Sequence, residues 1–163
     1  MAERARPHYD QVLVGDIETD ALTGLQGSRF DVIVCADVLG HLKRPTRTLG
    51  QLKEFLSDKG VFLISVANVA FISMRLSLLM GQFNYQKPGG ILDDDHLRHF
   101  TLRGLKDTLS EAGLETVSVR GYNLVRRRYF FLKALGWLFP ALFCIQFLAV
   151  ARRRLNGGTG GTL

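Results

Sequence analysis

The sequence feature that most constrains the fold is an alternation of β-branched apolar runs with one amphipathic segment. Residues 30–36 (FDVIVCA) and 61–66 (VFLISV) are nearly continuous apolar runs, as in strands buried on both faces of a parallel sheet. Between them, Pro45 can open a helix whose apolar residues recur at helical spacing, and Gly60 is a candidate stop. The alternation predicts an α/β fold with a mostly parallel sheet.

Other segments extend this pattern. The apolar run 11–15 (QVLVG) is predicted as another strand, and residues 114–122 alternate as a strand does. Thr101 caps a predicted helix that ends at Gly113. Residues 67–100 do not fit the alternation, so we expect an insertion there with one short helix and a long loop that acts as a lid.

The charge of the chain is uneven. Its 163 residues suffice for one domain, and the net charge is +6. Residues 1–125 carry 14 Lys/Arg and 15 Asp/Glu, whereas residues 126–163 carry 7 Lys/Arg and no acid. Two arginine triplets, 126–128 and 152–154, bracket an apolar segment, which favours an anionic membrane surface over DNA or RNA. No nucleic-acid partner is therefore expected.

The bracketed segment, 129–151, allows three interpretations. It has 23 residues and one charge, enough to span a bilayer. A proline and a glutamine interrupt it, so the alternative is a helix near 130–138 followed by a strand near 145–150. A third interpretation is peripheral contact with lipid. Residues 1–152 are predicted to form the domain, and 153–163 a disordered, Gly-rich tail.

The two cysteines indicate the compartment. Cys35 and Cys144 both lie in apolar runs, which excludes a disulfide-stapled scaffold and a zinc cluster. Residues 1–10 are polar and contain no signal-peptide core. A reducing, cytoplasmic location is expected, with the inner face of the membrane as an alternative site of contact.

Several segments together resemble a known family, the class I methyltransferases that use S-adenosylmethionine. The branch that they resemble contains small sugar- and lipid-modifying enzymes and carries segments such as "DVLEHL", "GxLD…HLRFFT" and "PxLFxxQF". The resemblance covers roughly residues 8–152 and rests on these segments: 14–17, 30–33, 36–42 (ADVLGHL), 60–68, 90–93 (GILD), 96–101 (HLRHFT), 112–114 and 139–147. It implies a Rossmann-like methyltransferase fold.

The chain also departs from the family pattern. The family begins with two strands and a Gly-rich GxGxG turn that cradles the methionine end of the cofactor, and neither precedes residue 11 here. We therefore expect a partial methyltransferase domain. Its start is misassigned, or the gene is a fragment, or a second chain, identical or different, completes the sheet.

By this resemblance, five residues are expected to contact S-adenosylmethionine. Asp16 would accept a hydrogen bond from the adenine amino group, and Ile17 would pack on the adenine ring. The backbone of Ala36, Asp37 and Val38 would flank the amino acid end of the cofactor. From the residues alone, Asp16 could equally be an ordinary turn residue at a strand end, and Ile17 could belong to the core.

Polar residues after the predicted strands are candidates for catalysis and substrate binding. His41 and His96 could act as general bases, because a histidine pKa lies near ~6.5, although a structural role for either is the alternative. Asp93 would belong to a substrate-facing lid, and Arg98 would bind an acidic acceptor. The run 93–95 could instead be a solvated turn. Gly40 replaces the middle acid of a related metal-binding pattern, so no metal is expected.

The expected reaction is methyl transfer from S-adenosylmethionine to a hydroxyl group of a sugar, a polysaccharide or a lipid-linked acceptor. Without the GxGxG turn, the chain could be inactive by itself. One alternative is a non-catalytic, methyltransferase-like module that pairs with a complete partner. The other is a membrane-associated protein anchored by residues 129–151.

Overall fold

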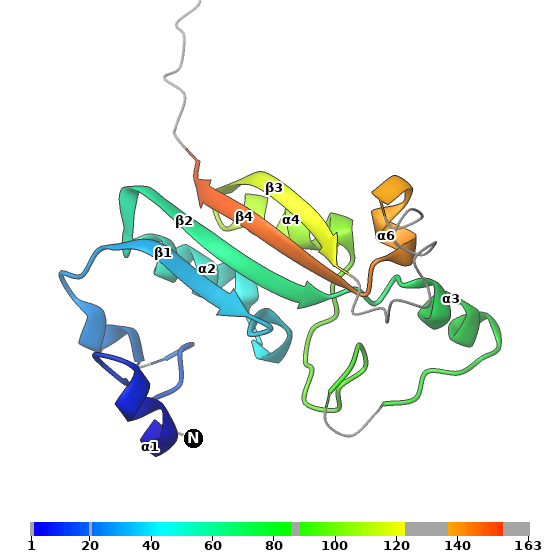
Figure 1. Cartoon of the computed structure of the whole chain (residues 1–163), viewed down its shortest axis with the longest axis horizontal. Helices are drawn as coiled ribbons and strands as arrows, with labels where there is room; N and C mark the ends of the chain where they lie inside the picture. Colours follow the sequence, from blue (N-terminus) through cyan, green and yellow to red (C-terminus); the bar gives the residue numbers. More distant parts are fainter. Residues whose placement is uncertain (1, 20, 86–88, 123–136, 155–163) are drawn as a thin grey trace, which may run out of the picture.

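The computed structural model describes residues 2–19, 21–85, 89–122 and 137–154. Four strands form one sheet in the order β1-β2-β4-β3 (Figure 1). They are β1 (Phe30–Ala36), β2 (Leu56–Ala67), β3 (Leu114–Tyr122) and β4 (Gln146–Arg153). The predicted strands 30–36, 61–66, 114–122 and 145–150 are confirmed as these four.

The sheet is mixed rather than mostly parallel. β1 and β2 run parallel, whereas β4 is antiparallel to both of its neighbours, β2 and β3. The reason is the place where β4 begins. It follows the short helix α6 (Pro140–Phe143) and starts with Gln146 opposite Ala67, the last residue of β2, so it must run back along β2.

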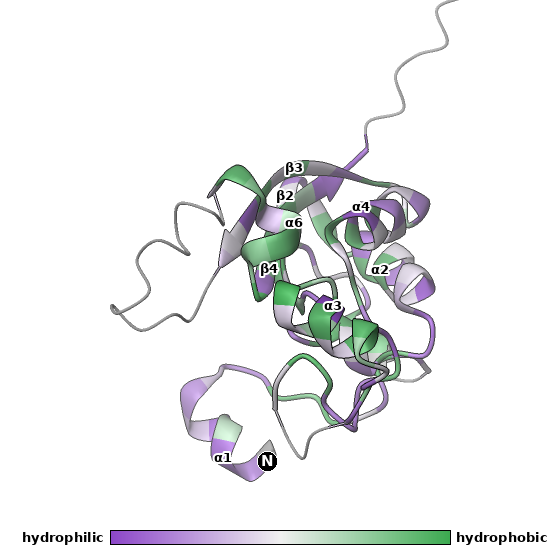
Figure 2. Ribbon diagram, turned by 90° about the vertical axis from the view of Figure 1, so that its right-hand side faces the viewer, coloured by the Kyte–Doolittle hydropathy of each residue, from purple (hydrophilic) through white to green (hydrophobic). Residues whose placement is uncertain are grey.

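Two helices cover one face of this sheet. α2 (Pro45–Lys53) and α4 (Leu102–Glu111) lie side by side on it (Figure 2). Their apolar faces and the facing strand residues are fully buried: Leu49, Leu105 and Leu109 from the helices, and Phe62, Ile64 and Phe147 from the sheet. Thr101 caps α4 as predicted, because its hydroxyl accepts a hydrogen bond from the Gly104 amide at 3.1 Å.

The end of α2 differs from the prediction. The helix stops at Lys53, and Gly60 lies inside β2. A Cβ atom at Gly60 would lie 2.8 Å from the Phe30 carbonyl oxygen. This glycine therefore allows two strands to approach closely, and it does not terminate the helix.

The prediction of a strand over residues 11–15 is wrong. The chain begins with α1 (Ala2–Ala5) and the 3₁₀ turn η1 (Arg6–His8), and residues 11–14 form no regular element. Val14 is 76% exposed. An apolar run becomes a strand only where a neighbour pairs with it, and in the described part of the chain the outer edge of β1 has none.

The C-terminal segment is folded into the sheet. In its described part, residues 137–154, α6 leads into β4, whose Phe147, Ala149 and Ala151 are fully buried. Among the described residues, no helix has both the length and the apolar character required to cross a bilayer. β4 continues through Arg153, one residue into the predicted tail. Residues 129–136 and 155–163 lie outside the described residues.

Candidate functional site

A pocket lies where the carboxyl ends of β1 and β2 meet, which is where open α/β sheets bind ligands. On the sheet side it is lined by Asp37, Gly40, Val66 and Ala67. On the other side it is lined by residues of the returning chain: Ile91, His96, Arg98, His99 and Phe100. Five of the predicted site residues surround this region: Asp37, His96 and Arg98 line it, and Ala36 and Val38 flank Asp37.

The returning chain belongs to the predicted insertion. After β2 the chain enters α3 (Ile72–Leu79) and then a long loop that runs back to α4 (Figure 1). A bridge between Asn68 and Phe100 joins the start of this excursion to its end. We call residues 80–85 and 89–100 the lid loop. Its contacts with residues 40–43, described below, hold it over the ends of β1 and β2.

Asp37 is held in an unusual conformation by two partners. Its φ is 55°, a left-handed value that costs most residues other than glycine about 1–2 kcal/mol but that aspartate adopts more readily. The Ser65 hydroxyl donates to its Oδ1 at 3.0 Å, and the Gln146 amide donates to both carboxylate oxygens at 2.8 and 2.9 Å. These bonds join β1, β2 and β4 at one point and fix the direction of the backbone at Asp37. The sequence analysis missed this role of Ser65 and Gln146.

Gly40 makes room for the lid loop. A Cβ atom there would lie 2.8 Å from Cδ2 and 3.0 Å from Nε2 of His96. The Gly40 carbonyl oxygen also accepts hydrogen bonds from the amides of Leu97 and Arg98, at 2.8 and 3.0 Å. The glycine that departs from the "DVLEHL" pattern is therefore the position against which His96 packs.

His41 and His96 lie together beside the pocket. Their ring centroids are 4.7 Å apart, and Nδ1 of His41 lies 3.1 Å from the carbonyl oxygen of Asp95. A carbonyl oxygen can only accept, so this contact requires the proton of a neutral His41 ring to be on Nδ1. The Nε2 lone pair of His41 is then the atom that could accept a proton from a substrate.

His99 connects this pair of rings with two further aromatic side chains of the lid loop. Its ring centroid lies 6.1 Å from that of His96, 6.0 Å from that of Phe83 and 6.2 Å from that of Tyr85. Burial, and to a lesser extent the charge of His96, lowers the pKa of His99. Because its pKa is lowered, the His99 ring is largely neutral at pH 7, and a neutral ring is suited to packing among aromatic side chains.

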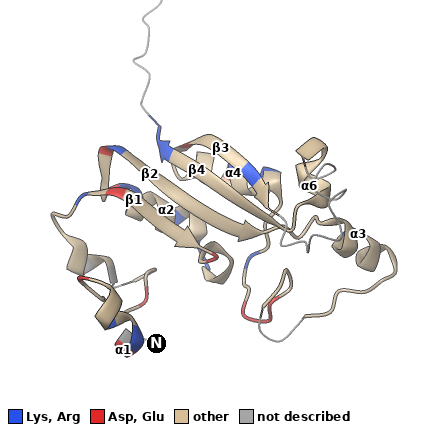
Figure 3. Cartoon of the chain, viewed as in Figure 1, with Lys and Arg blue, Asp and Glu red and all other residues tan. Residues whose placement is uncertain are grey.

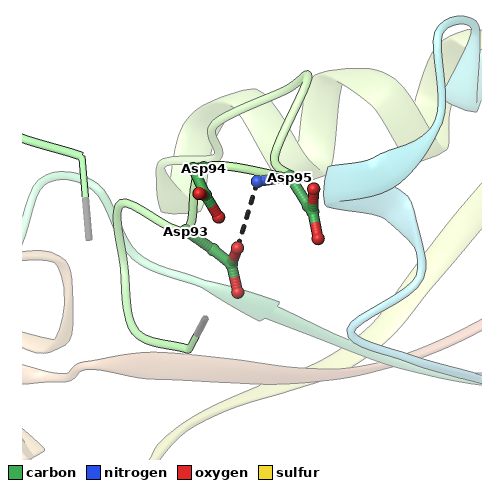
Figure 4. Close-up of side chains that lie close together, drawn as sticks. All are labelled: Asp93, Asp94 and Asp95. Carbon is green, nitrogen blue, oxygen red and sulfur yellow. Dashed lines mark hydrogen bonds between the residues drawn. The ribbon is translucent and has the colours of Figure 1, made fainter. Parts of the chain in front are cut away.

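The three acidic residues of the lid loop form a turn. Their carboxylates lie within 4.8 Å of one another (Figure 4). Asp93 accepts hydrogen bonds from the amides of Gly89, at 2.7 Å, and Asp95, at 3.1 Å. These bonds, the one from Asp95 foremost, lower the pKa of Asp93. Asp93 thus shapes the lid loop, as in the alternative interpretation of the sequence.

Arg98 attaches the lid loop to the body of the protein. Its Nε and Nη2 donate to the carbonyl oxygen of Lys43, at 3.2 and 2.8 Å. Figure 3 shows the red acidic stretch of the lid loop and a blue basic position where the loop runs back towards α4. Arg98 also lines the pocket.

Asp16 and Ile17 do not line this pocket. Asp16 Oδ1 accepts a hydrogen bond from the Glu18 amide at 2.9 Å and so stabilises its own turn, and Ile17 packs against the core. Glu18, which the sequence analysis did not single out, accepts hydrogen bonds from the amides of Lys43 and Arg44 at 3.0 and 2.8 Å. This carboxylate brings the N-terminal segment to the start of α2.

A scan against protein-family models matches residues 3–119 to a family described as a methyltransferase domain. The search of curated proteins finds no match.

Solved structures share the fold. A possible histamine N-methyltransferase from Thermotoga maritima superposes with a TM-score of 0.65 at 16% identity, covering 94% of this chain and 69% of that one. A methyltransferase from Archaeoglobus fulgidus gives 0.60 at 15% identity, with coverages of 93% and 71%. One from Clostridium acetobutylicum gives 0.58 at 14% identity, with coverages of 93% and 68%. All three are described as methyltransferases that depend on S-adenosylmethionine.

Proposed function

The chain belongs to the methyltransferase domain family, and from this premise we propose that it binds S-adenosylmethionine at the carboxyl ends of β1 and β2 and takes part in methyl transfer. The observation that carries the proposal is the position of Asp37 directly after β1, beside a pocket of about 10 Å³ that residues of the sheet edge and of the lid loop both line. The backbone of Ala36, Asp37 and Val38 would face the amino acid end of the cofactor. Asp16 and Ile17 would approach the adenine.

In this proposal His41 and His96 act on the methyl acceptor. A methyl transfer is accelerated mainly by holding donor and acceptor in line, and a base assists by removing the acceptor proton. Nε2 of His41 is available for that proton, and His96 packs beside it. We propose a hydroxyl group of a sugar, a polysaccharide or a lipid-linked molecule as the acceptor. We also propose the cytoplasm as the location, since Cys35 and Cys144 are both buried and neither forms a disulfide.

We propose further that another strand pairs with the outer edge of β1, which has no neighbour among the described residues, and completes the cofactor site. The face of β1 away from the core is also uncovered, since Val32 and Val34 alternate with the core residues Ile33 and Cys35 and are 49% and 62% exposed. The strand would come from a longer form of this polypeptide or from a second chain. The same exposed edge favours the alternative function, a non-catalytic module that pairs with a complete methyltransferase.

Isothermal titration calorimetry with S-adenosylmethionine tests the proposal. The chain is measured as it stands and with its in-frame upstream codons restored. Asp37→Asn should weaken binding at least tenfold, because an amide in place of the carboxylate loses the attraction for the Gln146 amide. Asp31→Asn is the matched control. Asp31 lies at the other end of β1 and also accepts from a serine hydroxyl, that of Ser57 at 2.7 Å.

Equal binding by the two variants would refute the assigned position of the cofactor. An absence of binding by both lengths of the unmutated chain would refute cofactor binding itself, and would leave the non-catalytic function.

A further inference from the structure

A second pocket, open to solvent and with a mainly apolar exposed lining, adjoins the first on the side of α2. The pocket has a volume of about 580 Å³, within the range of small-molecule sites. Four cationic residues line it: Lys43, Arg44, Arg47 and Arg98. Its other lining residues include Thr46 and His99, and none carries a carboxylate. We call it the basic pocket.

The charges of the basic pocket are not neutralised within the part of the chain that the structure describes. The two ion pairs found there are Arg103–Asp107 and Arg152–Glu115. The carboxylate of Glu18 accepts hydrogen bonds from the backbone amides of Lys43 and Arg44. None of the four cationic side chains forms an ion pair with a carboxylate in the part of the chain that the structure describes.

The local secondary structure adds to this positive field. Helices usually carry acidic residues in their first turn, because the helix dipole is positive there. The first turn of α2 has no acidic residue, and Arg44, which precedes it, makes no capping hydrogen bond through its side chain. Three positive charges lie at the N-terminus of α2 instead, on Lys43, Arg44 and Arg47. An anion bound among the four cations would offset the repulsion.

The basic pocket and the proposed transfer site share lining residues. Arg98, His99 and Phe100 line both pockets. Arg98 is held between them by its two hydrogen bonds to the Lys43 carbonyl oxygen, through Nε and Nη2. A molecule with its anionic group in the basic pocket would extend its other end towards His96 and His41.

We propose that the basic pocket binds the phosphate group of the methyl acceptor, and that Lys43, Arg47 and Arg98 supply its charge-assisted hydrogen bonds. The acceptor is then a small phosphorylated molecule such as a sugar phosphate. This inference rests on the proposed methyl transfer and narrows its substrate class. The phosphate of a lipid headgroup offers the same chemistry, so the experiment separates the two sources.

The test measures binding of glucose 1-phosphate, of inorganic phosphate and of glucose, the uncharged comparison, by isothermal titration calorimetry. Both phosphates should bind, and glucose should not. Arg47→Gln should weaken phosphate binding about tenfold, the effect of one charge-assisted hydrogen bond. Arg103→Gln is the matched control, since Arg103 lies on the surface of α4 and pairs with Asp107. It should change the affinity less than twofold.

Three results would overturn the inference. The first is no phosphate binding by the folded chain, and the second is equal weakening by Arg47→Gln and Arg103→Gln. The third is binding to vesicles that contain phosphatidic acid without binding to glucose 1-phosphate, which would indicate a membrane surface instead. S-adenosylmethionine titrations of the unmutated chain keep the two proposals separate. Intact cofactor binding with no phosphate binding refutes only this inference, whereas the reverse refutes the proposed cofactor site.

Discussion

Asn68 provides the sharpest test of how the site is held together. It follows the last residue of β2, is 0% exposed, and donates from its side-chain amide to the carbonyl oxygens of Cys144 at 2.7 Å and Ala141 at 3.1 Å. Its Oδ1 accepts from the Ala70 amide at 3.0 Å. One side chain thereby connects the end of β2 with α6 and the start of β4, next to the pocket.

Asn68→Asp keeps the shape of the side chain and replaces its NH₂ donor by a carboxylate oxygen that faces two carbonyl oxygens. Full burial raises a carboxyl pKa by about 3 units or more, and each unit corresponds to about 1.4 kcal/mol. The variant should therefore lose about 4 kcal/mol of unfolding free energy at pH 7. For a chain of this length, that loss lowers the melting temperature by about 8–16 °C.

The loss should depend on pH with a definite sign. The raised pKa in the folded state means that the folded variant binds a proton more tightly than the unfolded one. Stability relative to the wild type therefore falls as pH rises above ~4. At pH 3 the neutral acid can donate one hydrogen bond, and the deficit shrinks to about 1 kcal/mol.

Urea denaturation monitored by circular dichroism, at several pH values, measures both effects. Asn84→Asp is the matched control, because Asn84 is exposed on the lid loop, and it should change stability by less than about 0.5 kcal/mol. Equal stability of the two variants at pH 7, or a loss that does not vary with pH, would refute the role given to Asn68.

Two further predictions concern packing and burial. Gly121→Ala should cost about 1–3 kcal/mol in urea denaturation, because the new Cβ would overlap Sγ of Cys144 and lie 2.8 Å from its Cβ. Gly50→Ala on α2 is its control, since the nearest atom is 4.0 Å away and stability should not fall; similar losses in both would contradict the packing argument. Burial raises the pKa of the Cys35 thiol to about 11, so native protein at pH 8 should react with iodoacetamide far more slowly than urea-unfolded protein, and stability should decline as pH rises from about 9 to 11. Labelling of Cys35 at the same rate in both states would rule out its burial.

The elements that the sequence predicted correctly are those whose burial follows from neighbouring residues. α4 repeats Leu105 and Leu109 on one face and is capped by Thr101, so its period and its start are both local. The strand predicted over residues 11–15 is absent because an apolar run forms a strand only if another strand lies beside it. The prediction that Gly60 ends the helix was wrong because the sequence does not distinguish a glycine that ends a helix from one that allows a close backbone contact.

The candidate site also contains some contacts that the sequence predicts and others that it does not. Residues 36–41 are consecutive and begin at the last residue of β1, so one motif predicts that they lie together. The contact of Gly40 with His96 and the bond of Gln146 to Asp37 join residues 56 and 109 positions apart, which a single sequence does not pair. Glu18, which binds the start of α2 from 25 residues upstream, was missed for the same reason.

The hydrogen bond between Gln146 and Asp37 can form only late in the synthesis of the chain. Ribosomes add about 5–20 residues per second, so the 109 residues between the two side chains take about 5–20 s to synthesise. During that interval β1 and β2 can pair, but Asp37 lacks the amide that holds both of its oxygens. A nascent or prematurely ended chain that stops before Gln146 therefore cannot give the pocket its final shape, however completely the earlier strands have folded.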